Sequence, residues 1–203
     1  MGKNMESTSV GDSMKELKLA ITPAQVEEAK EKQAEFDAQK TYNKFVCKTN
    51  YIGLLGEMVF NDYLTSTGAK FEWVQFTKQG WNDPDFIIGG KSIDLKTTFS
   101  PVMWMQKEKW DIYLYAHLSK DEKTLTIKGW LPKEEITKAK ASGKGCKIVN
   151  RGSRQDWIFM PTDMYNIEWL SFILEESVSA PEEVIIFQKI IQKKKGEEDD
   201  SEE

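Results

Sequence analysis

The chain is poor in the residue types on which several common functional sites depend. It contains one histidine and two cysteines, which excludes mechanisms that need a pair of histidines. Cys47 and Cys146 lack the spacing of metal ligands, so we expect free thiols in a reducing, cytoplasmic compartment. No apolar run approaches the roughly 18 residues of a membrane-spanning helix, and the polar N-terminus is unlike a secretory signal. We therefore expect no membrane association.

Acidic and basic residues are unevenly distributed along the chain. The net charge is -5, but residues 196–203 carry six acids and no base, so the remainder of the chain carries +1. We expect a flexible segment over residues 1–20, a single domain over 21–195 and a disordered acidic tail over 196–203. The tail is interpreted as a solubilising end. The alternatives are a contact for a protein partner, or a DNA-like decoy that folds back over a basic groove.

Positive charge gathers between Lys133 and Arg154, where the local net charge is +5. The only two arginines of the chain, Arg151 and Arg154, lie at its end. Arginine suits bidentate contacts with phosphate or guanine, and the interleaved glycines and serines let a backbone approach phosphates. We expect Lys144, Lys147, Arg151 and Arg154 to contact DNA. The alternative is a solvated loop that follows a helix.

Hydrophobic periodicity and turn residues predict helix, then sheet, then helix. Thr22 and Gln25 have the spacing of a capping box, Asn50 is a candidate cap for the second helix, and Gly68 ends that helix. The order favours an α/β or α+β domain with a mixed central sheet flanked by helices. The expected helices span 22–40, 51–67, 132–141, 163–174 and 181–195, and the expected strands span 71–76, 85–88, 92–97, 111–118 and 157–161, with a hairpin over 124–131.

The segment 83–96 reads as two short strands joined at Gly89-Gly90. Side chains alternate between the faces of a strand, so Asp94 and Lys96 point the same way while their apolar neighbours point into a core. Asp85, on the preceding strand, is within reach across the hairpin. Two carboxylates and a lysine are the minimum set for holding a divalent metal ion beside an activated water.

The helix expected at 51–67 contributes one more carboxylate. Its apolar residues follow helical spacing, and Glu57 lies at the edge of that arc next to Gly56. Taken alone, Glu57 is best interpreted as a flanking surface residue. Its position before a hairpin with Asp85, Asp94 and Lys96 favours membership of a site instead.

A helical Glu57, then Pro84-Asp85, then Asp94-Leu95-Lys96 resembles the PD-(D/E)XK nuclease superfamily, which has the restriction-endonuclease-like fold. The resemblance covers roughly residues 50–118. It implies that Asp85, Asp94 and the backbone carbonyl of Leu95 bind Mg²⁺, for which Mn²⁺ can substitute. Glu57 would hold a coordinated water or a second ion. Lys96 would orient and help deprotonate the attacking water, or stabilise charge on the phosphorus.

One further residue is a weaker match to the same family. Gln106, ten residues after Lys96, corresponds to a glutamine that some members place after the lysine. The recombination-nuclease branch has the pattern Q-x-x-x-Y, whereas this chain has Trp110 at the position of the tyrosine. Gln106 is therefore a candidate site residue with a departure from the pattern.

The resemblance implies a Mg²⁺-dependent DNA nuclease, more an endonuclease than an exonuclease. A small protein from a phage or mobile element that acts on branched DNA is a variant of this reading. The alternative is a non-catalytic DNA- or protein-binding module on the same fold, although the presence of all four residues favours the enzyme. The apolar helix expected at 181–195 could dock on the core or pair with a second copy, so a homodimer stays open.

Overall fold

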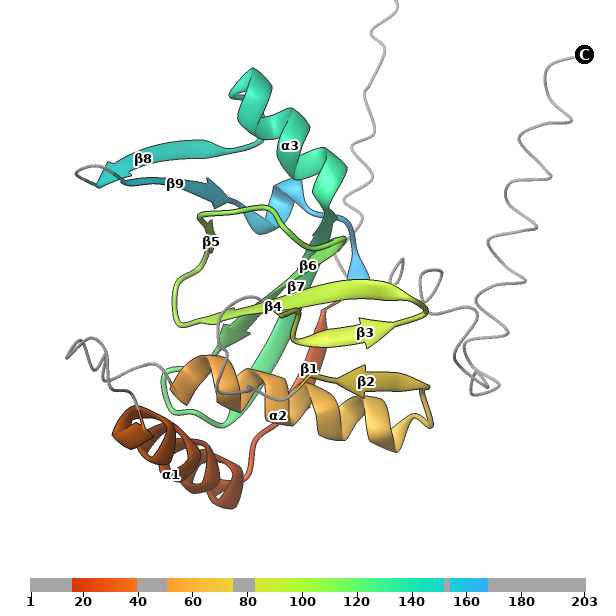
Figure 1. Ribbon diagram of the computed structural model, residues 1–203, viewed down its shortest axis with the longest axis vertical. Coiled ribbons are helices and arrows are strands. Elements are labelled where there is room, and N and C mark those ends of the chain that lie inside the picture. Colours follow the sequence, from red (N-terminus) through yellow and green to blue (C-terminus); the bar gives the residue numbers. More distant parts are fainter. Residues whose placement is uncertain (1–15, 40–50, 75–82, 152–153, 168–203) are drawn as a thin grey trace, which may run out of the picture.

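The computed structural model describes residues 16–39, 51–74, 83–151 and 154–167. This part of the chain is a mixed α+β fold (Figure 1). Its elements are β1 (Leu17–Ala20), α1 (Pro23–Gln39), α2 (Tyr51–Ser66), β2 (Phe71–Trp73), β3 (Phe86–Ile88), β4 (Lys91–Thr98), β5 (Met103–Met105), β6 (Ile112–Leu118), β7 (Thr124–Pro132), α3 (Lys133–Ser142), β8 (Lys147–Arg151), β9 (Arg154–Phe159) and a 3-10 turn, η1 (Pro161–Asp163).

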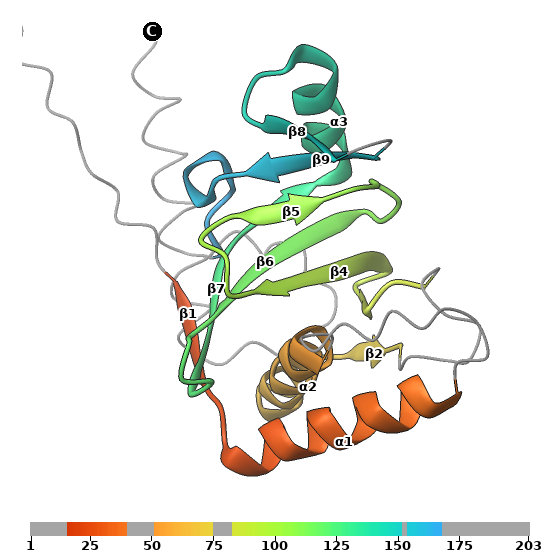
Figure 2. The same cartoon turned by 90° about the vertical axis from the view of Figure 1, so that its left-hand side faces the viewer.

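The strands form two sheets. The larger sheet has the order β1-β7-β6-β4-β3-β2, and the smaller has the order β5-β9-β8. All neighbours in the larger sheet are antiparallel except β4 and β6, which run parallel. In Figure 2, α1 and α2 lie on one side of the larger sheet, and the smaller sheet and α3 lie on the other. The expected mixed sheet with flanking helices is confirmed.

Local signals account for the ends of both N-terminal helices. The backbone N–H of Gln25 donates to Thr22 Oγ1 at 3.2 Å, and the Thr22 N–H donates to Gln25 Oε1 at 2.9 Å, so the capping box is confirmed. The Gln25 amide also donates to Asp62 Oδ2 of α2 at 2.7 Å. At the end of α2, Gly68 adopts a φ of 71°, the left-handed conformation that favours glycine.

The β3–β4 hairpin turns at Gly89 and Gly90, with φ values of 55° and 73°. Two consecutive residues with positive φ suit a tight antiparallel hairpin, because the twist of such a turn matches that of the strands. The register pairs Phe86 with Ile93. Asp85, one residue before β3, therefore lies across from Asp94.

The two faces of the larger sheet carry separate cores. One core packs the apolar sides of α1 and α2 against alternate residues of the sheet, including Phe60 of α2, Phe86 of β3 and Leu95 of β4. The other lies beneath the smaller sheet and α3, and includes the fully buried Tyr113 and Tyr115. The rings of Phe60 and Phe86 meet edge to face at 5.3 Å, a geometry that favours aromatic attraction. The sheet thus separates two packed layers.

Several sequence predictions need correction. Residues 17–20 were expected to be flexible, yet they pair with β7 as strand β1. The expected hairpin over 124–131 is one continuous strand, β7, because β6 and β1 pair along its two edges. The solvated loop considered as the alternative for the basic segment 133–154 is, from Lys147 on, the β8–β9 hairpin. Met164 to Asn166 are not helical, since Tyr165 bridges to Trp130 instead.

Some predictions fall outside the part of the chain that the structure describes. These are the cap at Asn50, Cys47, the helices expected beyond residue 167 and the acidic tail. Cys146, which is described, is a free cysteine. Among the described helices, none combines the length and the apolar character needed to cross a membrane.

Candidate functional site

The Asp94 and Lys96 side chains lie on the face of β4 opposite Leu95. Asp94 is buried, with 7% of its surface exposed, whereas 38% of the Lys96 side chain is exposed. Lys96 Nζ lies 2.5 Å from Asp94 Oδ2, which makes a close ion pair. The geometry provides no aligned hydrogen bond to this oxygen within the described residues. The buried oxygen Oδ2 of Asp94 is therefore paired with a lysine that is itself partly exposed.

Asp85, the residue just before the neighbouring strand β3, joins this pair. Its Oδ2 accepts a hydrogen bond from the backbone N–H of Leu95 at 2.6 Å, and its own N–H donates to the Ile93 carbonyl at 2.9 Å. Two bonds to β4 hold the residue in place even though it precedes β3. The structure thus brings together Asp85, Asp94 and Lys96, as the hairpin pattern predicted.

Glu57 reaches the same place from α2, which packs on the other face of β4. The helix comes very close to the strand at Gly56, where an added Cβ would lie 1.9 Å from Thr97 Oγ1. This glycine permits the approach because it has no side chain. The Trp73 indole N–H of β2 donates to Glu57 Oε2 at 3.4 Å, a long bond that orients the carboxyl group.

Burial and mutual repulsion raise the pKa of two of these carboxyl groups. Burial raises the pKa of Glu57 to about 7; the Trp73 hydrogen bond lowers it, Asp94 raises it and Lys96 lowers it. The pKa of Asp85 rises well above its ordinary value, because of burial first and then the charges of Glu57 and Asp94. Like charges in one site disfavour full ionisation of the group. The three carboxyl groups therefore interact as one cluster.

The pKa of Lys96 is also raised, and for a basic group this shift favours the charged form. Burial lowers the pKa of its ammonium group, but Asp94, through its charge and its contact with Nζ, and then Asp85 outweigh this and raise it. Lys96 therefore remains a cation near neutral pH, and it is the positive charge that offsets the carboxylates in this cluster.

The donor chemistry of the cluster suits a hard divalent cation, because Mg²⁺ and Mn²⁺ prefer carboxylate oxygens. Asp94 Oδ2 is buried without an aligned donor, which is the kind of oxygen that a cation would satisfy. In the described residues, however, no group of three or more His, Cys, Asp or Glu is arranged to hold a metal ion. The residues fit the chemistry, and binding would need the carboxyl groups to close around the ion.

The other predicted site residues come from elements later in the chain. Gln106 is exposed just after β5. Lys144 is exposed in the turn after α3, and Lys147 is exposed at the start of β8. Arg151 and Arg154 face each other at the tip of the β8–β9 hairpin, and their side chains lie outside the described residues. The predicted DNA contacts thus belong to a hairpin and its base, not to the carboxylate cluster.

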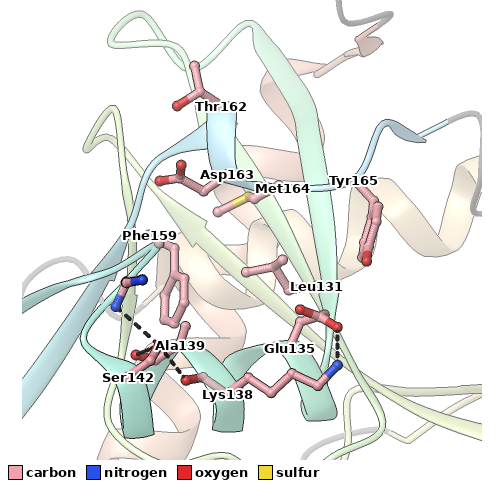
Figure 3. A pocket seen from close by; sticks show the side chains of 12 residues that line it. Leu131, Glu135, Lys138, Ala139, Ser142, Phe159, Thr162, Asp163, Met164 and Tyr165 are labelled. Carbon is pink, nitrogen blue, oxygen red and sulfur yellow. Dashed lines mark hydrogen bonds and ion pairs between the residues drawn. The ribbon is translucent and has the colours of Figure 1, made fainter.

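A pocket of about 410 Å³ opens between α3 and the chain that follows β9 (Figure 3). Its walls are mixed in charge, with Glu135 paired to Lys138 at 2.7 Å on one side and Asp163 on another. Among the predicted site residues whose side chains the structure describes, Lys144 lines it. The pocket is therefore distinct from the carboxylate cluster.

One residue beside the cluster, Trp73, was not anticipated from the sequence, and it orients Glu57. The sequence leaves Thr97 either as a hydroxyl donor to phosphate or as an ordinary strand residue; its buried hydroxyl lies against Gly56 without a hydrogen-bond partner among the described residues. Sixteen residues separate Trp73 from Glu57, and a tryptophan at a strand end usually packs the core. The small Gly56 next to Glu57 was the one local signal of a close helix–strand contact.

Comparison of this chain with family models, with curated proteins and with solved structures found no match. The interpretation of the carboxylate cluster therefore rests on its residues and their geometry.

Proposed function

We propose that this chain is a metal-dependent DNA nuclease, acting as an endonuclease, of the PD-(D/E)XK type with a restriction-endonuclease-like core. One observation carries the proposal: Glu57 of α2, Asp85 just before β3, and Asp94 and Lys96 of β4 form one electrostatic cluster. These are the four residues that the sequence resemblance names. Hairpin geometry alone groups Asp85, Asp94 and Lys96, so the support for the resemblance comes from Glu57, which joins them from a separate helix.

Asp85, Asp94 and the Leu95 carbonyl are the proposed ligands of Mg²⁺, or of Mn²⁺ in its place, and Glu57 holds a coordinated water or a second ion. A bound ion would lower the pKa of a coordinated water, and it would place positive charge beside the phosphate. The carboxyl groups supply oxygen ligands whose mutual repulsion a cation would relieve. Asp94 would exchange its ion pair with Lys96 for the cation.

Lys96 supplies a positive charge beside the phosphate in this proposal. In the metal-free fold Asp94 and Asp85 raise its pKa, but a cation bound to those two carboxylates would weaken that effect. The proposal therefore keeps both roles that the resemblance implies, stabilisation of negative charge on the phosphorus and orientation and deprotonation of the attacking water. Its partly exposed position allows the ammonium group to reach a substrate.

A non-catalytic DNA- or protein-binding module is the second candidate, and one observation favours it. The described residues contain no ready-made metal-binding group, and Lys96 already pairs with Asp94. An internal ion pair of this kind can serve the fold alone. The two candidates differ in whether the purified protein cuts nucleic acid when a divalent ion is supplied.

The test is cleavage of supercoiled plasmid and of branched and single-stranded DNA in Mg²⁺, Mn²⁺ or EDTA. Lys96→Ala and Asp94→Ala are purified in parallel, with Lys18→Ala as the matched control, an exposed lysine on β1 that β7 and β6 separate from β4. We expect metal-dependent cutting that falls by at least about 100-fold in the two site variants, with unchanged circular dichroism and wild-type activity for Lys18→Ala.

Either of two results would overturn this assignment. Cutting by Lys96→Ala at the wild-type rate would show that the activity lies elsewhere or comes from a contaminant. Absence of cutting on every substrate, with DNA binding retained, would favour the binding module.

A further inference from the structure

The chain between β4 and β6, which includes β5, lies on the side of the larger sheet opposite α1 and α2 (Figure 2). Leu95 packs in the core on the helix side, so Asp94 and Lys96 belong to the same side of the sheet as this connection. In the parallel register, Asp94 pairs with Tyr113 and Lys96 pairs with Tyr115. Paired residues on adjacent strands share a face. The two tyrosines are therefore the direct neighbours of the aspartate and the lysine in the next strand.

The hydroxyl groups of these tyrosines hold both ends of that connection. Tyr115 Oη donates to the Ser100 carbonyl at 2.6 Å, near the end of β4. Tyr113 Oη accepts the backbone N–H of Trp110 at 2.8 Å and also that of Lys109, just before β6. Both rings are buried. Two neighbouring side chains thus fix the backbone that runs beside the carboxylate cluster.

Contacts with the second core and with α3 also hold the middle of this connection, between Ser100 and Lys109. Met103 and Met105 of β5 are buried in the second core. Glu108 forms an ion pair with Lys140 of α3, whose ammonium group lies 3.5 Å from the centroid of the Trp157 ring. The backbone of residues 100–110 is therefore held by side-chain contacts at both ends and in the middle.

Positive charge faces outward from this fixed backbone. Lys107 and Lys109 are exposed on either side of the half-buried Glu108, and Lys109 Nζ lies 4.2 Å from the centroid of the Trp110 ring. Lys140 offsets Glu108. The nearby Asp111 accepts hydrogen bonds from Ser92, which lower its pKa.

Two further lysines are close to the same surface. Lys91 and Lys133 both lower the pKa of Asp111, after the larger effect of its hydrogen bonds. The Lys133 ammonium group donates to the Lys109 carbonyl at 3.5 Å, and its backbone N–H donates to the Asp111 carbonyl at 2.9 Å. The local balance of charge is therefore positive, which suits a polyanion.

We propose that Lys107 and Lys109 form a phosphate-binding rim that holds the nucleic-acid backbone beside Lys96. This inference rests on the proposed nuclease function and adds a substrate contact to it. Lysines neutralise phosphates without reading sequence, so the rim would position the strand and not select it. A backbone fixed by Tyr113 and Tyr115 loses little entropy on binding, which strengthens such contacts.

The test measures binding of a fluorescent 30-mer duplex to the full chain in EDTA across a range of salt concentrations. Lys107→Ala combined with Lys109→Ala should lower the slope of log K against log salt by nearly two, at about 0.9 per contact. The matched control is Lys120→Ala combined with Lys123→Ala, which removes two exposed lysines beyond the other end of β6. Equal slopes for the two double variants would overturn the rim.

Tyr113→Phe tests the anchoring without changing charge. It removes the acceptor of two backbone N–H groups, so binding should weaken several-fold while the melting temperature is recorded as a check on folding. Wild-type affinity and slope in Tyr113→Phe would overturn the anchoring role.

Failure of the rim and failure of the nuclease give different results. If the wild type cuts DNA with Mg²⁺ but both lysine double variants keep its salt slope, the rim is wrong and the nuclease stands. If the wild type never cuts but only the Lys107/Lys109 variant loses slope, the rim stands as a binding surface and the nuclease is wrong. If both hold, the rim variant should show a raised KM with a nearly unchanged kcat.

Discussion

The carboxylate of Asp85 accepts a hydrogen bond from the backbone N–H of Leu95 at 2.6 Å, across the β3–β4 hairpin. This bond places one predicted metal ligand against the centre of the Asp94-Leu95-Lys96 triplet. It also lowers the pKa of Asp85, although burial and the neighbouring charges of Glu57 and Asp94 raise it by more. The Asp85 carboxylate is therefore held in place by a hydrogen bond to the backbone, while burial and repulsion by Glu57 and Asp94 disfavour its charged form.

Replacing Gly56 tests the contact that brings Glu57 to the cluster. In Gly56→Ala the new Cβ would lie 1.9 Å from Thr97 Oγ1 and within 3 Å of two further Thr97 atoms. The helix has to move away from β4, so we expect a loss of about 1–3 kcal/mol in the free energy of unfolding. Urea titration of the purified variant measures it.

Gly53→Ala is the matched control, because a Cβ at Gly53 meets nothing within 4 Å. It should stabilise α2 by about 0.5–1 kcal/mol, as expected for replacing glycine by alanine inside a helix. Equal effects at the two positions would contradict the close contact at Gly56.

The raised pKa of Glu57 predicts a loss of stability as pH rises. The folded protein keeps the Glu57 proton up to a pKa of about 7, whereas the unfolded chain releases it near 4.5. Protonation therefore favours folding below pH 4.5, and this contribution is lost as pH rises through 7, with a slope of up to about 1.4 kcal/mol per pH unit. Glu57→Gln should flatten this loss and be more stable than the wild type at pH 8.

Urea unfolding at pH 5, 6, 7 and 8 without divalent ions provides the measurement. Glu35→Gln, at an exposed position on α1, serves as the control and should follow the wild type. Parallel curves for Glu57→Gln and the wild type would mean that Glu57 is not buried beside the other carboxylates.

Divalent cations should stabilise the fold if the carboxyl groups bind them. At pH 8, Mg²⁺ at about ten times its dissociation constant adds about 1.4 kcal/mol, which corresponds to a rise of a few degrees in Tm for a chain of this size. Asp94→Asn and Asp85→Asn should each remove the rise, because each removes a proposed ligand. Differential scanning fluorimetry in Mg²⁺ against EDTA, at matched ionic strength, measures it. A rise of the same size in all three proteins would exclude this site.

The two arginines at the tip of the β8–β9 hairpin remain predicted DNA contacts. Arg151→Ala combined with Arg154→Ala should weaken DNA binding and reduce the salt slope by about one unit for each lost phosphate contact. Their main chains pair at the hairpin end, so the substitutions leave the ladder in place. A salt titration of DNA binding tests this prediction. An unchanged slope of log K against log salt would mean that the hairpin tip is a solvated surface that does not contact phosphates.

Short-range patterns predicted the elements whose causes are local. The capping box of Thr22 and Gln25 needs only neighbouring residues, and so does the turn at Gly89-Gly90. The continuous strand β7 was read as a hairpin, although one of its partners, β6, precedes it by only a short turn. Its other partner, β1, is more than 100 residues away in the sequence, and no local pattern reports that pairing. The strand at Leu17–Ala20 was missed because its only partner in the described residues is the distant β7.

The candidate site divides in the same way. The alternation of Asp94 and Lys96 and the tight turn before them are properties of the sequence itself, because strand geometry and glycine conformation dictate them. Which helix carboxylate joins them was decided by the tertiary structure, through the approach of α2 to β4 at Gly56 and the hydrogen bond from Trp73. So was the raised pKa of Glu57, because burial and repulsion depend on groups that only the packed fold brings together.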